Sequence, residues 1–330
     1  MAQPQSIYLH IGLGKTGSSY IQSSLALSAD ALRDRGICYP SAGRQHERAL
    51  AGDVNVGNLP PTKGRGFHTD GSYDAAVDAA EMGDCTRLVF SNEGLFSSIV
   101  NQNLWPEIRA RAAQVPTHLL LFIRDPLDHA LSAYKQGVKG GLSKPIEGFL
   151  EGYAVPRQVD RFLDLAGEAP VTVTVRNYSR HRKTLLAETE AWLDLAPGQL
   201  AIPAKAQVNR SLTRAEECIQ IAFNRHVGRR ARLFVADALS NELPHIRSEM
   251  PYVAPDALAA FLDRMQEMTA PVNARLPEGE GFGVPTPDEA RALLPDAEDA
   301  GQYSLTEEQI EVLARNMASW FKPEYKADKP

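Results

Sequence analysis

The amino-terminal stretch "SIYLHIGLGKTGSS", residues 6–19, constrains the fold more than any other part of the chain. Its first six residues are mostly β-branched, aromatic or aliphatic, which is typical of a strand, and they run directly into a glycine-rich segment. From Ser18 onward apolar residues recur at helical spacing. We therefore predict a strand, a tight turn and a helix. In this arrangement converging backbone N–H groups and a helix N-terminus can bind an anion.

The turn has the side chains that an anion site needs, but it differs from a nucleotide-triphosphate P-loop. That loop has the pattern G-x-x-x-x-G-K-[ST]; here Gly12 and Gly17 have the right separation, while Ser18 occupies the lysine position and Lys15 lies inside the loop. The residues predicted to hold the anion are Gly14, Lys15, Thr16, Gly17, Ser18 and Ser19. The alternative is a plain glycine turn with an exposed lysine.

Three further strands are predicted, at 87–93, 118–126 and 171–178, and helical patterns separate them. The third of the four strands includes the wholly apolar run "LLLFI", which suits a strand buried on both faces of a parallel sheet. Alternation of strands and helices predicts an α/β fold, a P-loop-like doubly wound parallel sheet flanked by helices.

The rest of the chain is predicted to elaborate a single domain over residues 1–330. Residues 40–75 are rich in glycine, proline, asparagine and charge, so we expect a polar surface insertion there. From about 209 to 330 the patterns are mostly helical, and residues 304–321 predict a late helix with Thr306 as N-cap and Ile310, Leu313 and Met317 on one face.

Composition excludes several classes of function. The formal net charge of −6 and the pI of about 5.8 give no overall field that favours nucleic acid. The three cysteines, Cys38, Cys85 and Cys218, form no metal-spaced pair. The amino terminus resembles no signal peptide, and the run "LLLFI" is far too short to span a bilayer. We expect a cytoplasmic protein without a transmembrane segment.

A second motif follows the third predicted strand, in "FIRDPLDHALSAYKQ", residues 122–136. Arg124 falls at the carboxyl end of the strand, where α/β proteins bind ligands, and Ser132 falls two turns into the next helix. A guanidinium group and a hydroxyl together suit a terminal phosphate. The alternative for Arg124 is a surface ion pair with Asp125 or Asp128.

Together the two motifs resemble those of the sulfotransferases that use 3′-phosphoadenosine 5′-phosphosulfate (PAPS). That family has a K-x-G-[ST]-[ST] loop, here "KTGSS" (15–19), and an R-x-P-x-x-x-x-x-S-x-Y motif, matched by Arg124, Pro126, Ser132 and Tyr134. The segments "VRNY" (175–178) and "VNRSL" (208–212) are similar to later landmarks of bacterial members, whereas the R-K-G-x-x-G signature of the hormone and phenol enzymes is not found.

The resemblance implies a function. The loop would bind the 5′-phosphosulfate of PAPS, with Lys15 near the bridging oxygen, and Arg124 with Ser132 would bind the 3′-phosphate. The product would be adenosine 3′,5′-bisphosphate, and no metal would be required. The expected acceptor is a hydroxyl or amine of a saccharide or cell-envelope glycan.

Transfer to a hydroxyl or amine also needs a proton acceptor. Glu93 follows the second strand directly, so its carboxylate is the first candidate; a glutamate bonded to backbone N–H groups at a helix start is the alternative. His46, in the polar insertion, is the second candidate, against a solvated loop histidine.

Two other functions stay open at this stage. A nucleotide-dependent small-molecule kinase would need the motif lysine and a metal-binding aspartate at the end of a neighbouring strand, and neither is found. A nucleotide-sensing or interaction module would keep the fold without catalysis. The arginine-rich segment 225–232 is interpreted as a face toward an anionic substrate or cofactor phosphate, or as a solvated helix face.

Overall fold

The computed structural model describes residues 4–40, 43–53, 57–59, 72–80, 82–101, 104–204, 210–296 and 303–320. The chain divides into two compact units, each made of three chain segments. Unit 1 comprises residues 1–126, 154–208 and 267–283; unit 2 comprises residues 127–153, 209–266 and 284–330. The single domain predicted over 1–330 stays a prediction, and each unit is described by itself.

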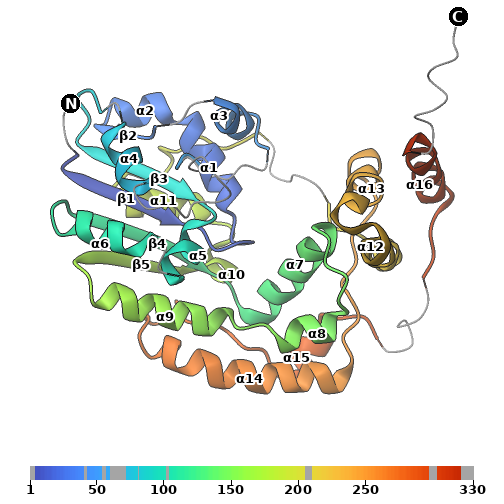
Figure 1. Ribbon diagram of the computed structural model, residues 1–330. Helices are drawn as coiled ribbons and strands as arrows, with labels where there is room; N and C mark the ends of the chain where they lie inside the picture. Colours follow the sequence, from blue (N-terminus) through green and yellow to red (C-terminus); the bar gives the residue numbers. More distant parts are fainter. Residues whose placement is uncertain are drawn as a thin grey trace, which may run out of the picture. The chain divides into compact units, whose positions relative to one another are not determined.

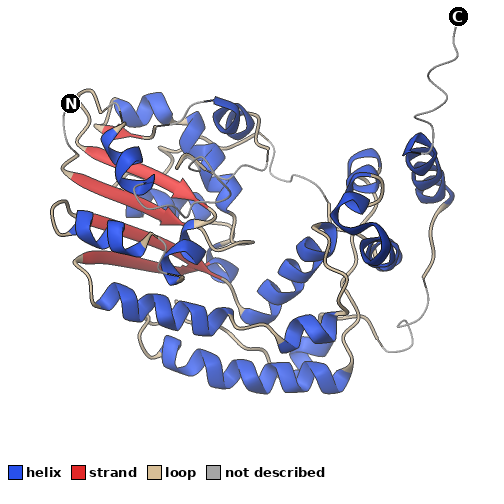
Figure 2. Ribbon diagram, in the orientation of Figure 1, coloured by secondary structure: helices blue, strands red, loops and turns tan. Residues whose placement is uncertain are grey.

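Unit 1 contains one five-stranded sheet in which every strand pair is parallel (Figures 1 and 2). The strand order is β2-β3-β1-β4-β5. The strands are β1 (Ser6–Ile11), β2 (Ile37–Cys38), β3 (Arg87–Asn92), β4 (Thr117–Ile123) and β5 (Val171–Asn177). This confirms the predicted α/β class with a parallel sheet.

Helices cover both faces of the sheet. One face packs against helices that include α1, α3 and α11, and the other against helices that include α4, α5, α6 and α9. The helices of unit 1 are α1 (Ser18–Leu27), α2 (Ala29–Arg33), α3 (Gly43–Leu50), α4 (Ser72–Asp78), α5 (Leu95–Val100), α6 (Trp105–Ala112), α9 (Val155–Gly167), α10 (Tyr178–His181) and α11 (Leu185–Trp192).

Strand β4, which lies between β1 and β5, shows why helices must cover both faces of the sheet. Leu119 and Leu121 lie in the core on one face, Leu120 and Phe122 lie in the core on the other, and all four are fully buried. A strand with apolar residues at every position is stable only where both faces are covered. The strand ends at Ile123, three residues before the predicted end, because α7 begins at Pro126.

The predicted surface insertion at 40–75 is only partly a surface feature. Within it, α3 packs against α1, and Leu59 is buried in the core. Asn58 accepts a hydrogen bond from the backbone N–H of Ser91 (2.8 Å) and donates one to the carbonyl of Val89 (3.0 Å). Residues 57–59 therefore line β3 beyond the end of the two-residue strand β2. Residues 60–71 lie outside the described part.

Among its described residues, unit 2 consists of helices joined by loops and contains no strand, as predicted for the carboxyl-terminal part. Its elements are α8 (Ile146–Glu151), α12 (Arg214–Val227), the 3-10 helix η1 (Gly228–Leu233), α13 (Ala236–Glu242), α15 (Pro287–Ala292) and α16 (Glu307–Trp320). Two helices, α7 (Pro126–Lys139) and α14 (Pro255–Asn273), begin in one unit and end in the other.

The late helix starts where it was predicted, and two of the three residues of its predicted apolar face are packed. The hydroxyl of Thr306 accepts the backbone N–H of Gln309 (3.3 Å), which confirms the N-cap. Val312 and Leu313 are buried in the core of unit 2 with Leu239, whereas Ile310 is 54% exposed. Met317 packs against the same core, so Ile310 is the member of the predicted face that lies at its exposed edge.

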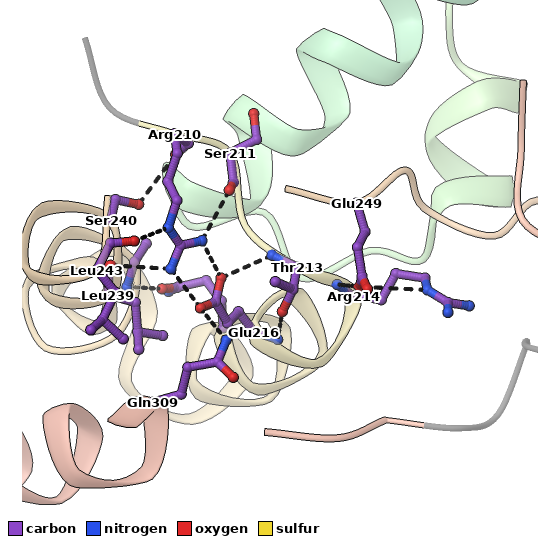
Figure 3. A network of polar contacts seen from close by, with 12 residues as sticks. Arg210, Ser211, Thr213, Arg214, Glu216, Leu239, Ser240, Leu243, Glu249 and Gln309 are labelled. Carbon is purple, nitrogen blue, oxygen red and sulfur yellow. Dashed lines mark hydrogen bonds and ion pairs between the residues drawn. The ribbon is translucent and has the colours of Figure 1, made fainter. Parts of the chain in front are cut away.

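A buried ion pair organises the start of α12 (Figure 3). Arg210 donates two hydrogen bonds of 2.7 Å to the carboxylate of Glu216, which also accepts from Thr213 N–H (2.8 Å) and Gln309 Nε2 (2.6 Å). Burial alone would raise the pKa of Glu216, but these bonds outweigh it and hold the pKa below its usual range. Thr213 and Glu216 complete a capping box.

The next residue, Glu217, is buried without such a partner. It is 5% exposed, and its Oε1 has no hydrogen bond among the described residues. Burial raises the pKa of Glu217 to about 7, although the nearby Lys135 opposes the shift. The Lys135 ammonium donates instead to the backbone carbonyl of Glu249 (2.5 Å). The pKa values of these two adjacent glutamates thus shift in opposite directions, because only the Glu216 carboxylate accepts hydrogen bonds.

Candidate functional site

The loop between β1 and α1 is held in one conformation by short backbone contacts. Gly12 N–H donates to the carbonyl of Asn92 (2.9 Å), and the fully buried Thr16 donates its hydroxyl to the carbonyl of Leu13 (2.5 Å). Lys15 (φ 65°) and Gly17 (φ 84°) both have left-handed backbone conformations. A lysine in this region is uncommon and costs conformational energy, which points to a functional constraint on the loop.

Two of the loop glycines are required by close packing. A Cβ at Gly12 would lie 2.8 Å from Ser18 Oγ and from the Cα of Glu93. At Gly17 it would lie 2.6 Å from a methyl group of Leu185. Gly14 has more room, with a carboxylate oxygen of Glu93 3.8 Å away. The loop therefore sits between the end of β3 and the start of α11.

The amino terminus of α1 offers free donors. Gly17 occupies the N-cap position and provides no side-chain cap. The backbone N–H groups of Ser18 and Ser19 have no partner among the described residues, as expected for the first turn of a helix. The hydroxyl of Ser18 is buried and also lacks a partner there. Unpaired donors at a helix amino terminus, together with the positive end of its dipole, suit an anion.

Arg124 reaches the loop from the end of β4. Its guanidinium group donates to the carbonyl of Lys15 (2.7 Å) and lies 5.4 Å from the ring centroid of Tyr178. Strands β1 and β4 are neighbours, but the chain leaves β1 toward one edge of the sheet and leaves β4 toward the other. The carboxyl ends of such a strand pair are where α/β sheets bind ligands.

Lys15 and Glu93 interact electrostatically at the same edge. Burial lowers the pKa of Lys15, the nearby Arg124 lowers it further, and Glu93 opposes both. Burial raises the pKa of Glu93, and Lys15 opposes that shift. The pair thus places a cation and a carboxylate of raised basicity beside one loop. Perturbed groups of this kind are typical of functional sites, although structural ion pairs perturb pKa values as well.

A buried histidine lies directly before the loop. His10 is fully buried on β1, and its Nδ1 is 2.7 Å from the hydroxyl of Ser91 on β3. Burial lowers the pKa of His10 to about 4, so the imidazole is neutral at pH 7. Its Nε2 and both amide atoms of the buried Gln22 have no partner among the described residues. Buried polar atoms without partners are rare in folded proteins. We interpret His10 as part of the support of the loop.

Asp125 supports the site rather than facing a ligand. Its carboxylate accepts from Asn177 Nδ2 (2.8 Å) and from Gly283 N–H (2.7 Å), and its own N–H donates to the hydroxyl of Ser179 (3.1 Å). Asn177 is fully buried and caps α10 by accepting from Ser179 N–H (2.9 Å). These bonds connect the turn after β4 to the turn after β5.

The structure does not place two of the predicted site residues, Ser132 and His46, with Lys15, Glu93 and Arg124. Ser132 lies half-buried on α7 within unit 2, so its pairing with Arg124 over one phosphate stays a prediction. His46 lies half-buried on α3, a helix rather than a loop, and its role as proton acceptor also stays a prediction. The residues that the structure does bring together are Lys15, Glu93 and Arg124.

Tyr178 is the residue at this edge to which sequence analysis gave no role. Its ring lies beneath Arg124 and would be 3.1 Å from a Cβ at Gly17. The signal available in the sequence was an aromatic residue directly after a strand. That position placed Tyr178 at the carboxyl edge of the sheet, but nothing local indicated contact with a loop more than 150 residues earlier.

Comparisons with known proteins do not identify the chain. No protein-family model matches it, and no curated protein matches its sequence. Within the described ranges, no helix has both the length and the apolar character to cross a bilayer. The same residues contain no group of three or more His, Cys, Asp and Glu side chains that could hold a metal ion.

Proposed function

We propose that the protein is a PAPS-dependent sulfotransferase that moves a sulfuryl group to a hydroxyl or amine of an acceptor. The observation that best supports the proposal is the meeting of Lys15, Arg124 and the open amino terminus of α1 at the carboxyl ends of β1 and β4. This donor set fits an anion that contains phosphate or sulfate groups. The motif resemblance specifies PAPS, which supplies the sulfuryl group.

The loop would then act as a P-loop-like cradle for the 5′-phosphosulfate. Gly14 and Gly17 allow the backbone to approach it, while Ser18 and Ser19 offer N–H groups and hydroxyls. Thr16 would contribute only its backbone N–H, because its buried hydroxyl donates to the carbonyl of Leu13. Fixed donors stabilise charge that develops in the transition state, and loss of one such donor typically costs roughly 10²–10³-fold in rate. In this proposal Lys15 neutralises the charge that develops on the bridging oxygen as the leaving group departs.

Glu93 is the proposed proton acceptor, with His46 as the second candidate. The acceptor oxygen attacks sulfur, the bond from sulfur to the bridging phosphate oxygen breaks, and its electron pair stays on adenosine 3′,5′-bisphosphate. Glu93 takes the acceptor proton, and its raised pKa makes it a better base than an ordinary carboxylate. Arg124 and Ser132 would fix the 3′-phosphate. A saccharide or cell-envelope glycan is the proposed acceptor, on the resemblance alone.

One observation favours a kinase as the second candidate. Glu93 directly follows β3, the neighbour of β1, and lies beside the loop. A carboxylate at a strand end next to a phosphate loop could ligate Mg²⁺ instead of accepting a proton. Ser18 at the motif-lysine position counts against this candidate, because Lys15 is displaced into the loop.

Calorimetric titration distinguishes the candidates. The full-length protein is titrated with adenosine 3′,5′-bisphosphate, with AMP, and with ATP plus magnesium. Micromolar or tighter binding of the bisphosphate, with little binding of AMP, is the result expected for the sulfotransferase. Preference for ATP with magnesium would support the kinase, and no binding of any of the three would refute both. Arg124→Ala should weaken bisphosphate binding more than AMP binding if Arg124 contacts the 3′-phosphate.

A further inference from the structure

A second functional surface lies in unit 2, at the end of α12 and along η1. We call residues Arg225–Leu233 the arginine surface. Its four arginines are exposed, and Val227 and Leu233 are exposed by 44% and 56%. Ala231, in contrast, is fully buried in the core of unit 2 with Phe234 and Leu239. Burial of Ala231 fixes the orientation of the 3-10 helix, so its other side chains point outward.

The charge of this surface is only partly neutralised within the protein. Arg232 forms an ion pair with Asp237 (2.9 Å), and Arg229 donates to the carbonyl of Gly140 (3.3 Å). Arg225 and Arg230 have no hydrogen bond or ion pair among the described residues. The whole chain has a formal net charge of −6, so this positive charge is local. The charge of Arg225 also acts on the nearby Tyr134 hydroxyl. Positive charge gathered on one part of an acidic protein creates a local field that attracts anions at that place rather than over the whole surface.

The exposed aliphatic side chains distinguish between possible partners. In a 3-10 helix residues three apart lie on the same side, so Arg230 and Leu233 share one side of η1. A free polyanion would be bound by the arginines alone, and the surface contains no Phe, Tyr or Trp side chain on which nucleic-acid bases stack. An anionic membrane uses both groups, because basic residues bind headgroups while aliphatic residues enter the interface.

We propose that the arginine surface docks the protein onto the face of an anionic lipid membrane. Arg230 binds headgroup phosphates or carboxylates, and Leu233, on the same side of η1, enters the boundary between headgroups and acyl chains. Arg225, in the last turn of α12, adds positive charge near the membrane surface. The docking is peripheral and reversible, and it depends on ionic strength. It does not depend on the sulfotransferase proposal, since every residue in it lies outside the loop between β1 and α1, residues 12–17, which we call the anion loop.

Vesicle co-sedimentation tests the proposal with the full-length protein. Vesicles of phosphatidylcholine alone are compared with vesicles in which part of that lipid is replaced by phosphatidylserine. Binding is expected only to the anionic vesicles and is expected to fall as salt is added. The double variant Arg225→Gln/Arg230→Gln should bind about 30-fold more weakly, since each basic residue near such a surface contributes about 1 kcal/mol. Leu233→Ser should weaken binding roughly 5-fold.

Matched variants elsewhere on the surface provide the controls. Arg157→Gln/Arg161→Gln removes two exposed arginines one turn apart on α9, and Ile202→Ser removes an aliphatic side chain that is 77% exposed. Neither should change vesicle binding. Lack of binding to anionic vesicles, or an equal loss in the controls, would overturn the proposal. So would tight binding to heparin combined with no effect of Leu233→Ser on vesicle binding, because charge alone would then explain the surface.

Discussion

Replacing Gly17 by alanine tests the packing that fixes the anion loop. Any side chain at φ 84° costs about 1–2 kcal/mol. The new Cβ would also lie 2.6 Å from a Leu185 methyl group and 3.1 Å from the Tyr178 ring, and overpacking of this kind typically costs about 1–3 kcal/mol. We therefore expect Gly17→Ala to lower the free energy of unfolding by about 2–5 kcal/mol.

Gly279 provides the matched control. It has the same φ of 84° and lies in unit 1, but nothing would lie within 4 Å of its added Cβ. Gly279→Ala should therefore cost only about 1–2 kcal/mol. Urea unfolding followed by circular dichroism gives both values, and calorimetry with adenosine 3′,5′-bisphosphate should show weakened binding for Gly17→Ala alone.

A double-mutant cycle with Leu185→Ala isolates the clash. If the clash is real, the double variant Gly17→Ala/Leu185→Ala costs less than the sum of the two single variants. Equal destabilisation by Gly17→Ala and Gly279→Ala, with additive costs in the cycle, would refute the packing argument.

Three further predictions concern individual charged groups. Lys15→Ala should lower the rate of sulfuryl transfer roughly 10²–10³-fold in a steady-state assay. Lys15→Gly should lower this rate equally. It should also raise the free energy of unfolding by about 1 kcal/mol, because glycine adopts the positive φ of residue 15 without strain. If Glu93 is the base, the acid limb of the rate profile should lie above the usual carboxyl pKa, since burial raises the pKa of Glu93, and Glu93→Gln should abolish that limb; an unchanged profile would favour His46. Glu217 binds its proton more tightly when folded (pKa about 7) than when unfolded (about 4.5), so its contribution to stability is present at low pH and is lost as the pH rises toward 7. Urea unfolding should therefore show Glu217→Gln stabilising the protein by about 2.5 kcal/mol more at pH 8.5 than at pH 5, and equal effects at both pH values would contradict this.

The site elements that could be predicted from sequence are those with a local signal. The strand, glycine turn and helix at residues 6–27 follow from a change of periodicity around three glycines. Arg124 and Glu93 could be placed at the sheet edge because each comes directly after an apolar strand. Parallel strands bring such positions to one edge whatever the order of the strands, so no knowledge of topology was needed.

What sequence analysis missed depends on contacts between distant segments. Arg124 was expected beside a phosphate, which stays a prediction; its observed hydrogen bond to the carbonyl of Lys15, 109 residues earlier, was not expected. Asn58 belongs to a polar segment without strand character, yet its side chain bonds to β3 as a neighbouring strand would. Ile310 was predicted to share a face with Leu313 and Met317, and only the latter two pack against the core of unit 2. Helical periodicity defines a stripe of residues, whereas the partner helix decides which edge of that stripe is buried.

The hydrogen bonds that join the ends of β4 and β5 to residues 280–283 have a consequence for folding during synthesis. Asn177 at the end of β5 binds the carboxylate of Glu280 and the carbonyl of Gly281, more than 100 residues further along, and Asp125 binds Gly283. Synthesis adds roughly 5–20 residues per second, so all five strands leave the ribosome several seconds before these partners exist. During that interval the sheet edge lacks its support, and the nascent chain is expected to need protection by chaperones until residues 267–283 have emerged.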